Sequence, residues 1–134
     1  MECVFCRLAA MPEHLLDNEL AYAVFDLMPV SPGHMLIIPR RHAETFFDLT
    51  EAEEKAMLEL LHKGKKLLDD KYNPDGYNFG VNCGECAGQS VMHAHMHLIP
   101  RFKGDTKAPL GGVRGVIPEK MAEDAKKLAD SKNR

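Results

Sequence analysis

The spacing of hydrophobic residues predicts one long helix in the middle of the chain. Residues 50–71 show apolar positions at helical spacing, at Met57, Leu60, Leu61, Gly64, Leu67 and Leu68. The stretch begins with Thr50-Glu51-Ala52-Glu53, a capping-box sequence in which Thr50 and Glu53 satisfy each other's free backbone amides. Asn73-Pro74 ends the helix and Asp75-Gly76 turns the chain. We therefore expect a helix of about six turns with one apolar face.

Alternating patterns predict four strands around this helix. They cover residues 20–26, 35–39, 77–81 and 93–101. Residues 102–116 read as a loop, and Pro118 opens an amphipathic helix with Met121, Ala122, Ala125, Leu128 and Ala129 on one side. The pattern favours an α+β fold, an antiparallel sheet with the long helix packed on it. We expect a single domain over residues 1–134, with a loop and helical C-terminal extension from about residue 102.

Length and charge narrow the class of protein. A chain of 134 residues and 15.0 kDa fits one hydrophobic core. The 17 Lys and Arg residues against 20 Asp and Glu give a charge of −3, which argues against a nucleic-acid coat or a membrane-surface protein. No apolar run approaches the roughly 18 residues of a membrane span, and the acidic start lacks the features of a signal peptide. We expect a cytoplasmic protein with reduced thiols.

Three histidines dominate the last predicted strand. His93, His95 and His97 alternate with small or apolar residues, so the period of two places the three imidazoles on one face. Neighbours on that face begin roughly 6.6–6.8 Å apart and can converge on one ligand. Three alternating histidines are rarely explained by core packing alone, because each buried imidazole needs hydrogen-bond partners. The pattern therefore favours a functional role.

A polar turn precedes this strand, at residues 82–90. Its two glycines, Gly84 and Gly88, permit tight turns in which backbone amides point at an anion, and Gln89 and Ser90 add side-chain donors. An ordinary hairpin turn explains the same residues when they are taken alone. Next to a row of imidazoles, however, such donors suit phosphate chemistry.

These motifs together resemble the histidine-triad family. The segment from His93 to Ile99 matches the family's His-φ-His-φ-His-φ-φ signature, where φ is apolar. Residues 33–42 look like its Gly-His-x-Leu-Ile-Ile-Pro strand, Phe25-Asp26-Leu27 is similar to its ribose-contacting segment, and residues 82–90 resemble its phosphate loop. The resemblance covers nearly the whole chain up to about Arg101.

The resemblance implies a dimeric α+β nucleotide-binding fold that hydrolyses or transfers a nucleotide at its α-phosphate. His95 would be the nucleophile and form a transient nucleotidyl-imidazole, His97 would contact the phosphate, and His34 would support the nucleophile's ring. Asp26 would accept hydrogen bonds from ribose hydroxyls. The residues that would hold phosphate or leaving-group oxygens are Asn82, Gln89 and Ser90. Imidazole is a good nucleophile and leaving group near neutral pH, which agrees with this chemistry.

A pair of cysteines near the start of the chain suggests a metal. Cys3 and Cys6 have the two-residue gap that lets both thiolates bind one tetrahedral ion. The resemblance implies that His42 and His93 complete a closed Cys₂His₂ set, hence a structural zinc that leaves His95 free. We see no acidic cluster for Mg²⁺ and expect no catalytic metal. The second pair, Cys83 and Cys86, leaves open a Cys₄ site, a redox pair or two free thiols.

The leading hypothesis is an enzyme acting on adenosine-type nucleotides, either dinucleoside polyphosphates or nucleoside phosphoramidates. We expect a homodimer, a small-molecule nucleotide as partner, and neither nucleic-acid polymer nor membrane. One alternative is a nucleotide-binding regulatory module with negligible turnover. Another is a zinc hydrolase with His93 and His95 as catalytic ligands, which the absence of a nearby carboxylate base disfavours.

Overall fold

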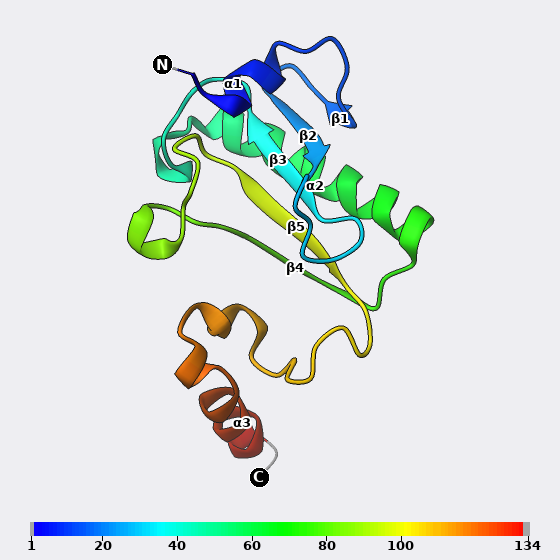
Figure 1. Ribbon diagram of the computed structural model, residues 1–134, viewed down its shortest axis with the longest axis vertical. Helices are drawn as coiled ribbons and strands as arrows, with labels where there is room; N and C mark the ends of the chain where they lie inside the picture. Colours follow the sequence, from blue (N-terminus) through cyan, green and yellow to red (C-terminus); the bar gives the residue numbers. More distant parts are fainter. Residues whose placement is uncertain (1, 133–134) are drawn as a thin grey trace. The chain divides into compact units, whose positions relative to one another are not determined.

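The computed structural model describes residues 2–132, and the side chains of residues 122–125, 128 and 132 lie outside what it describes. It divides the chain into two compact units, one up to Arg101 and one from Phe102 onwards. The sheet and the long helix belong to the first unit (Figure 1). None of the described helices is long and apolar enough to cross a membrane.

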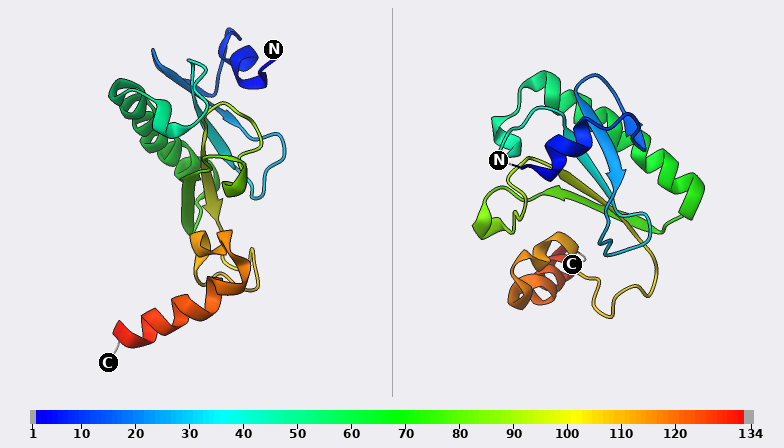
Figure 2. Two further views of the ribbon diagram at one scale, coloured as in Figure 1. Left: turned by 90° about the vertical axis from the view of Figure 1, so that its left-hand side faces the viewer. Right: turned by 45° about the horizontal axis from the view of Figure 1, so that its top comes forward.

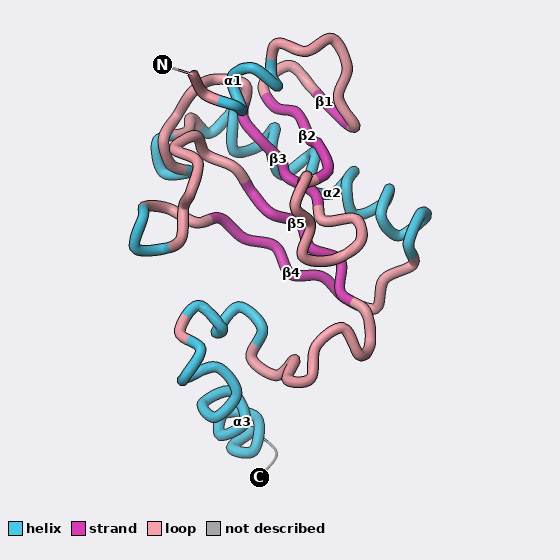
Figure 3. Tube along the Cα trace, in the orientation of Figure 1, coloured by secondary structure: helices cyan, strands magenta, loops and turns pink. Residues whose placement is uncertain are grey.

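A five-stranded sheet forms the first unit. Its strands are β1 (Leu16–Asp17), β2 (Ala21–Phe25), β3 (Met35–Pro39), β4 (Gly76–Val81) and β5 (Met96–Arg101). They are arranged in the order β1-β2-β3-β5-β4, and every neighbouring pair is antiparallel (Figure 3). The sheet thus has the α+β, antiparallel character that the sequence predicts. Because β5 lies between β3 and β4, the part of the histidine motif from Met96 onwards lies on an interior strand of the sheet.

Helix α2 (Glu51–Tyr72) packs along one face of this sheet (Figure 2). The predicted capping box is present: the Glu53 amide donates to the Thr50 hydroxyl, and the Glu53 carboxylate accepts from the Thr50 amide. Its apolar side forms the main core with the sheet, in a cluster of Ala21, Ala23, Met35, Ile37, Met57, Leu60, Leu61, Leu68, Met96 and Leu98. Gly64 lets the helix approach closely, since a Cβ there would lie 2.7 Å from the Met35 sulfur.

Helix α1 (Val4–Ala9) packs on a second, smaller core cluster of Phe5, Tyr22, Leu36 and Ile38. Along β3, Leu36 and Ile38 belong to this cluster while Met35 and Ile37 belong to the α2 core. Successive strand residues point to opposite faces, so α1 and α2 cover opposite faces of the sheet. The buried Tyr22 hydroxyl donates to the Phe5 carbonyl over 2.6 Å and ties α1 to β2.

The second unit contains the 3₁₀ turns Gly112–Val116 and Pro118–Lys120, followed by α3 (Met121–Lys132). The sequence predicts the helix after Pro118, and in the structure the first turn of this segment is 3₁₀. The sequence predicts residues 102–116 as loop throughout, and the structure differs at residues 112–116, which form a 3₁₀ turn. Of the expected apolar side of α3, Met121 is half-buried and Ala129 is exposed. The side chains of Ala122, Ala125 and Leu128 lie outside the described residues.

Two short elements, α1 and β1, are absent from the sequence prediction. The last strand also begins at Met96, three residues later than expected. The segment before it leaves the sheet: the Ala94 amide donates to the Ala43 carbonyl, and the His93 carbonyl accepts from the His95 side chain. His93 and His95 therefore belong to an irregular segment that leads into β5.

Candidate active site and metal centre

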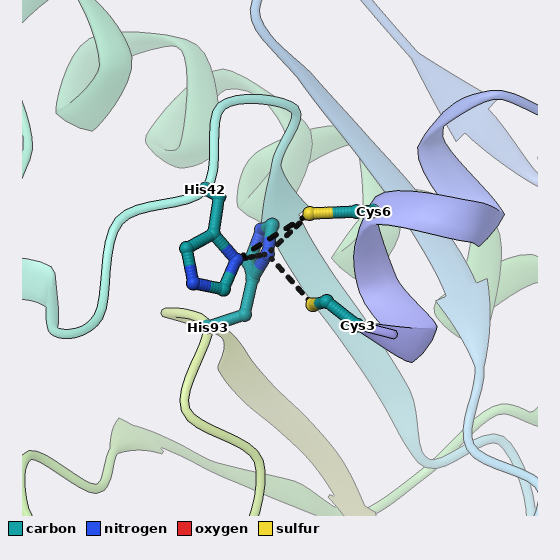
Figure 4. A group of neighbouring side chains, drawn as sticks. All are labelled: Cys3, Cys6, His42 and His93. Carbon is teal, nitrogen blue, oxygen red and sulfur yellow. Dashed lines mark hydrogen bonds between the residues drawn. The ribbon is translucent and has the colours of Figure 1, made fainter. Parts of the chain in front are cut away.

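Four side chains from three parts of the first unit converge beside α1. Cys3 and Cys6 come from the start of the chain, His42 from the loop after β3, and His93 from the segment before β5 (Figure 4). Their potential ligand atoms all lie within 4.8 Å of one another. The structure brings together the four residues that the sequence analysis assigns to one metal.

The spacing of these atoms fits a tetrahedral ion. Nδ1 of His93 lies 3.4 Å from Sγ of Cys3, 3.6 Å from Sγ of Cys6 and 3.2 Å from Nδ1 of His42. Sγ of Cys6 lies 3.4 Å from Nδ1 of His42. A tetrahedral zinc with Zn–N near 2.05 Å and Zn–S near 2.3 Å separates two nitrogens by about 3.3 Å and a nitrogen from a sulfur by about 3.6 Å. The donors thus already lie close to the spacing that zinc needs.

Hydrogen bonding prepares His93 as a ligand. Its Nε2–H donates to the Pro39 carbonyl over 2.8 Å, so the lone pair lies on Nδ1, the atom that faces the two sulfurs. Burial of the imidazole lowers the pKa of His93 and keeps it neutral at pH 7. Burial raises the pKa of the Cys6 thiol, and the neighbouring Cys3 raises it further. Because the two sulfurs are adjacent, ionisation of one thiol makes ionisation of the other unfavourable. A bound cation would remove this repulsion between the two thiolates.

His95 lies next to this cluster and is held at one ring nitrogen. Its Nδ1–H donates to the His93 carbonyl over 2.8 Å, which leaves the lone pair on Nε2. The residue is 6% exposed. Every buried side-chain nitrogen and oxygen of the described residues has a hydrogen-bond partner. No hydrogen bond of Nε2 of His95 is found among them, so this nitrogen is not fully buried and is accessible to solvent.

A chain of hydrogen bonds runs through His34 to His97. The Val30 amide donates to Nδ1 of His34 over 3.2 Å, so the proton of neutral His34 lies on Nε2. Nε2–H of His34 then donates to Nδ1 of His97 over 2.9 Å, with Oδ2 of Asp26 3.5 Å away. Neutral His97 consequently carries its proton on Nε2. Its ring centroid lies 5.2 Å from that of His95, so this N–H belongs to the same site.

Asp26, His34 and His97 also lie close enough together to suggest a second metal site. The bond from Val30 opposes that reading. A metal on Nε2 of His34 would move the imidazole proton to Nδ1, where it would face the Val30 N–H donor. Burial lowers the pKa of His34, partly offset by the Asp26 charge, so the ring is neutral. The trio is better described as a hydrogen-bonded relay.

The predicted support of His95 by His34 is not what the structure shows, because the hydrogen bond of His34 goes to His97. The sequence places His34 near the triad but does not show which imidazole it meets. That choice depends on the pairing of β3 with β5, in which Leu36 lies opposite His97.

The predicted phosphate loop gives its polar side chains different tasks. Gln89 is buried, accepts from the Gly84 amide over 2.8 Å and donates to the carbonyls of Glu44 and Val91. Both ends of its amide are therefore bonded to the backbone, and Gln89 holds the loop in shape. Ser90 is exposed and Asn82 is half-buried, so both are accessible to a ligand.

Comparison with known proteins identifies the family of this chain. The HIT domain profile matches residues 10–104. The chain belongs to the HIT family. A relative from Bacillus subtilis, "Protein hit", is 38% identical over 107 residues, which cover 77% of this chain and 74% of the relative. The "AP-4-A phosphorylase" of Mycobacterium tuberculosis is 34% identical over 84% of this chain, which spans only 58% of that longer protein.

A third HIT relative is the "Bis(5'-adenosyl)-triphosphatase" of Dictyostelium discoideum, 37% identical over 69% of this chain and 62% of the relative. Among solved structures, a HIT family protein from Bacillus anthracis superposes with a TM-score of 0.73 at 29% identity, covering 97% of this chain and 96% of its own. A Zn-bound histidine triad family protein from Mycobacterium smegmatis gives 0.72 at 26% identity, covering 98% and 97%. These HIT structures share the α+β fold of this chain.

Proposed function

We propose that this protein is a hydrolase or nucleotidyl transferase that acts at the α-phosphate of adenosine-type nucleotides through a nucleotidyl intermediate on His95. Two of its HIT relatives carry names of enzymes acting on diadenosine polyphosphates, which supports this class of substrate. The observation that carries the proposal is the hydrogen bond from Nδ1 of His95 to the His93 carbonyl. It leaves Nε2, the solvent-facing atom, with the lone pair that attacks phosphorus.

In the proposed reaction, Nε2 of His95 attacks the α-phosphorus and the bond to the leaving group breaks. The His93 carbonyl accepts the Nδ1–H of His95 and so stabilises the positive charge that the ring gains as its lone pair forms the new bond. Water or another acceptor then attacks phosphorus, and His95 leaves as a neutral imidazole. One difficult displacement becomes two easier ones.

His97 supplies a hydrogen-bond donor in this scheme. Because His34 donates to its Nδ1, the proton of His97 is held on Nε2, where it can reach a phosphate or leaving-group oxygen. Asp26 accepts hydrogen bonds from the ribose in the proposal, and Asn82 and Ser90 hold phosphate oxygens. Gln89 acts indirectly by shaping the loop that carries Ser90.

A turnover panel tests the proposal. We expect the protein to cleave diadenosine polyphosphates or adenosine phosphoramidates in the presence of a weak chelator that binds free metal ions and leaves the structural zinc in place. Mass spectrometry of rapidly quenched samples should find the nucleotidyl group on His95. His95→Ala should lose at least ~10³-fold in kcat while keeping the fold and nucleotide affinity. Binding without turnover would favour the regulatory module, and near-normal turnover in His95→Ala would reject the nucleophile.

The proposal includes a structural zinc held by Cys3, Cys6, His42 and His93. The donor spacing supports it, as does the Zn-bound relative from Mycobacterium smegmatis. Four protein ligands close the coordination sphere, so the ion would stabilise the fold and leave no open position for substrate. His93 would then be committed to the metal and take no part in proton transfer.

We further propose that the protein is a homodimer, as the resemblance to the histidine-triad family implies. Sedimentation at micromolar concentration should give about twice the mass of 15.0 kDa. A monomer under these conditions would reject this part of the proposal.

A further inference from the structure

Phe5 lies in the sequence between the two cysteines of the metal centre, and nothing in the proposed chemistry uses it. It is in the first turn of α1 and is 6% exposed. Its position is fixed on several sides: Cys3 and Cys6 flank it in the chain, and its carbonyl accepts the 2.6 Å hydrogen bond from Tyr22. The side chain therefore has little freedom as long as α1 is in place.

The Phe5 ring contacts two imidazoles that have different tasks. Its centroid lies 5.8 Å from that of the metal ligand His93, with an interplanar angle of 87°. It lies 5.0 Å from that of His95, with an angle of 64°. Both are edge-to-face contacts, the arrangement that aromatic rings prefer. Phe5 thus links the metal centre directly to the proposed nucleophile.

His95 needs such a contact because its hydrogen bond restrains only one ring atom. The torsion that turns an imidazole about its Cβ–Cγ bond has broad minima, so a single bond at Nδ1 allows the plane to tilt. Tilting moves Nε2 away from the line of attack, and displacements of about 1 Å can cost about 100-fold in rate. The ring of His97 meets His95 at 63° and Phe5 meets it at 64°, so two neighbours define its plane.

We propose that Phe5 is a positioning residue that holds the imidazole plane of His95 and makes its orientation depend on the metal centre. The inference rests on the proposed role of His95. When the four ligands are bound to one ion, α1 is fixed against the sheet and the Phe5 ring is pressed against His95. When the ligands separate, α1 loosens, Phe5 withdraws and His95 gains freedom.

The test compares Phe5→Ala and Phe5→Leu with the zinc-loaded wild-type chain. We expect kcat on a diadenosine polyphosphate to fall about 10- to 100-fold in Phe5→Ala while KM stays within about twofold, because substrate binding does not use this ring. In ¹⁵N NMR spectra the wild type should show His95 as a pure Nδ1–H tautomer, and the variant a mixture. Phe5→Leu keeps apolar volume in the same cluster but has no ring, so it should fold and still show the mixed tautomer.

Leu8→Ala is the matched control. Leu8 packs on the same cluster from the same helix, and the ring contacts of His93 and His95 described above do not involve it. It should keep the wild-type kcat and the His95 spectrum. An unchanged His95 spectrum in both Phe5 variants, or equal losses in Leu8→Ala and Phe5→Ala, would overturn the inference. The NMR comparison stands even if the wild type turns over no nucleotide, a result that would reject the proposed function alone.

Discussion

Nε2 of His34 lies 2.9 Å from Nδ1 of His97, although the two residues are 63 positions apart in the chain. Pairing of β3 with β5 brings them together, and the Val30 amide decides which way the proton lies. Since Nδ1 of His34 accepts from Val30, the bond runs from His34 to His97. A backbone N–H in the loop between β2 and β3 therefore determines the tautomer of a residue in the candidate active site.

Replacing His34 should disturb His97 rather than His95. His34→Leu removes the donor, so His97 can move its proton to Nδ1 and lose the N–H aimed at the ligand. We expect kcat to fall about 10- to 100-fold. His34→Gln offers an amide that can accept from Val30 and donate to His97, and it should recover much of this loss. The ¹⁵N spectrum of His97 should show mixed tautomers in His34→Leu only, and a change confined to His95 would contradict this order of contacts.

His97 should also make stability depend on pH. Burial, helped by the neighbouring His95 and His34 and opposed by the Asp26 charge, lowers the pKa of His97 to about 4. Between about pH 4 and its ordinary value of 6.5 the unfolded chain binds the proton and the folded chain does not. The stability contribution is therefore complete above pH 6.5 and is lost as the pH falls towards 4.

Urea unfolding at about pH 7.5 and about pH 4.5 measures this effect. The wild type should lose stability across this range, and His97→Gln should lose less, because one of the groups that resist protonation is gone. His34 and His93 also have lowered pKa values, so part of the dependence should remain. An identical pH dependence in wild type and His97→Gln would show that His97 titrates normally.

A buried carboxylate at the start of α2 also makes the stability of the fold depend on pH. Glu53 is 5% exposed and accepts from Nε and Nη2 of Arg41 over 2.9 and 2.8 Å and from the Thr50 amide over 2.9 Å. The Arg41 guanidinium lowers the pKa of Glu53 to about 2. Its stabilising effect is thus present above the ordinary pKa of about 4.5 and is lost as the pH falls towards 2.

Arg41→Ala should lower the melting temperature at neutral pH by on the order of 5 °C, because it leaves a buried charge with one partner fewer. It should also reduce the loss of stability in acid. Arg7→Ala is a suitable control, since Arg7 pairs with Glu2 at the surface over 3.0 Å and both side chains are exposed. Melting curves of both variants at neutral and acid pH make the comparison, and equal shifts would contradict the role of burial.

The long helix and four of the five strands carry strong local patterns, so the sequence predicts their presence, although the last strand begins three residues later than expected. α2 begins one residue after its predicted cap, and β3 has the predicted bounds. Helix α1 has only six residues, no side-chain cap and no acidic residue in its first turn. Its stability depends on packing of Phe5 against the sheet, which local sequence does not reveal.

In the candidate site, too, some features follow from local sequence motifs and others depend on tertiary contacts. The composition of the metal centre follows from the resemblance, because Cys3, Cys6, His42 and His93 occupy recognisable motifs. The bonding of Gln89 and the roles of Phe5 and Val30 depend on contacts between distant segments. The sequence shows that residue 5 is hydrophobic, but the contact of the Phe5 ring with His95 exists only once the sheet has formed.

Removal of single cysteines should separate the two thiol pairs. Cys3 belongs to the four-residue cluster, whereas the cluster includes neither Cys83 nor Cys86. Cys3→Ser should lose zinc and melt at lower temperature, since metal binding and folding of the N-terminal segment are linked. Cys83→Ser should keep one zinc per chain and a melting curve close to the wild type.

Activity should follow the metal only indirectly. Cys3→Ser and the wild type from which a strong chelator has removed the zinc should both lose kcat, because α1 and Phe5 no longer hold His95. Extra zinc added to the loaded protein should not accelerate the reaction, because four protein ligands leave no position for substrate. Elemental analysis, melting curves and kcat on the same samples make the test. Zinc retained in Cys3→Ser and lost in Cys83→Ser would overturn this metal centre, and a rate that rises with added zinc would point to a catalytic ion instead.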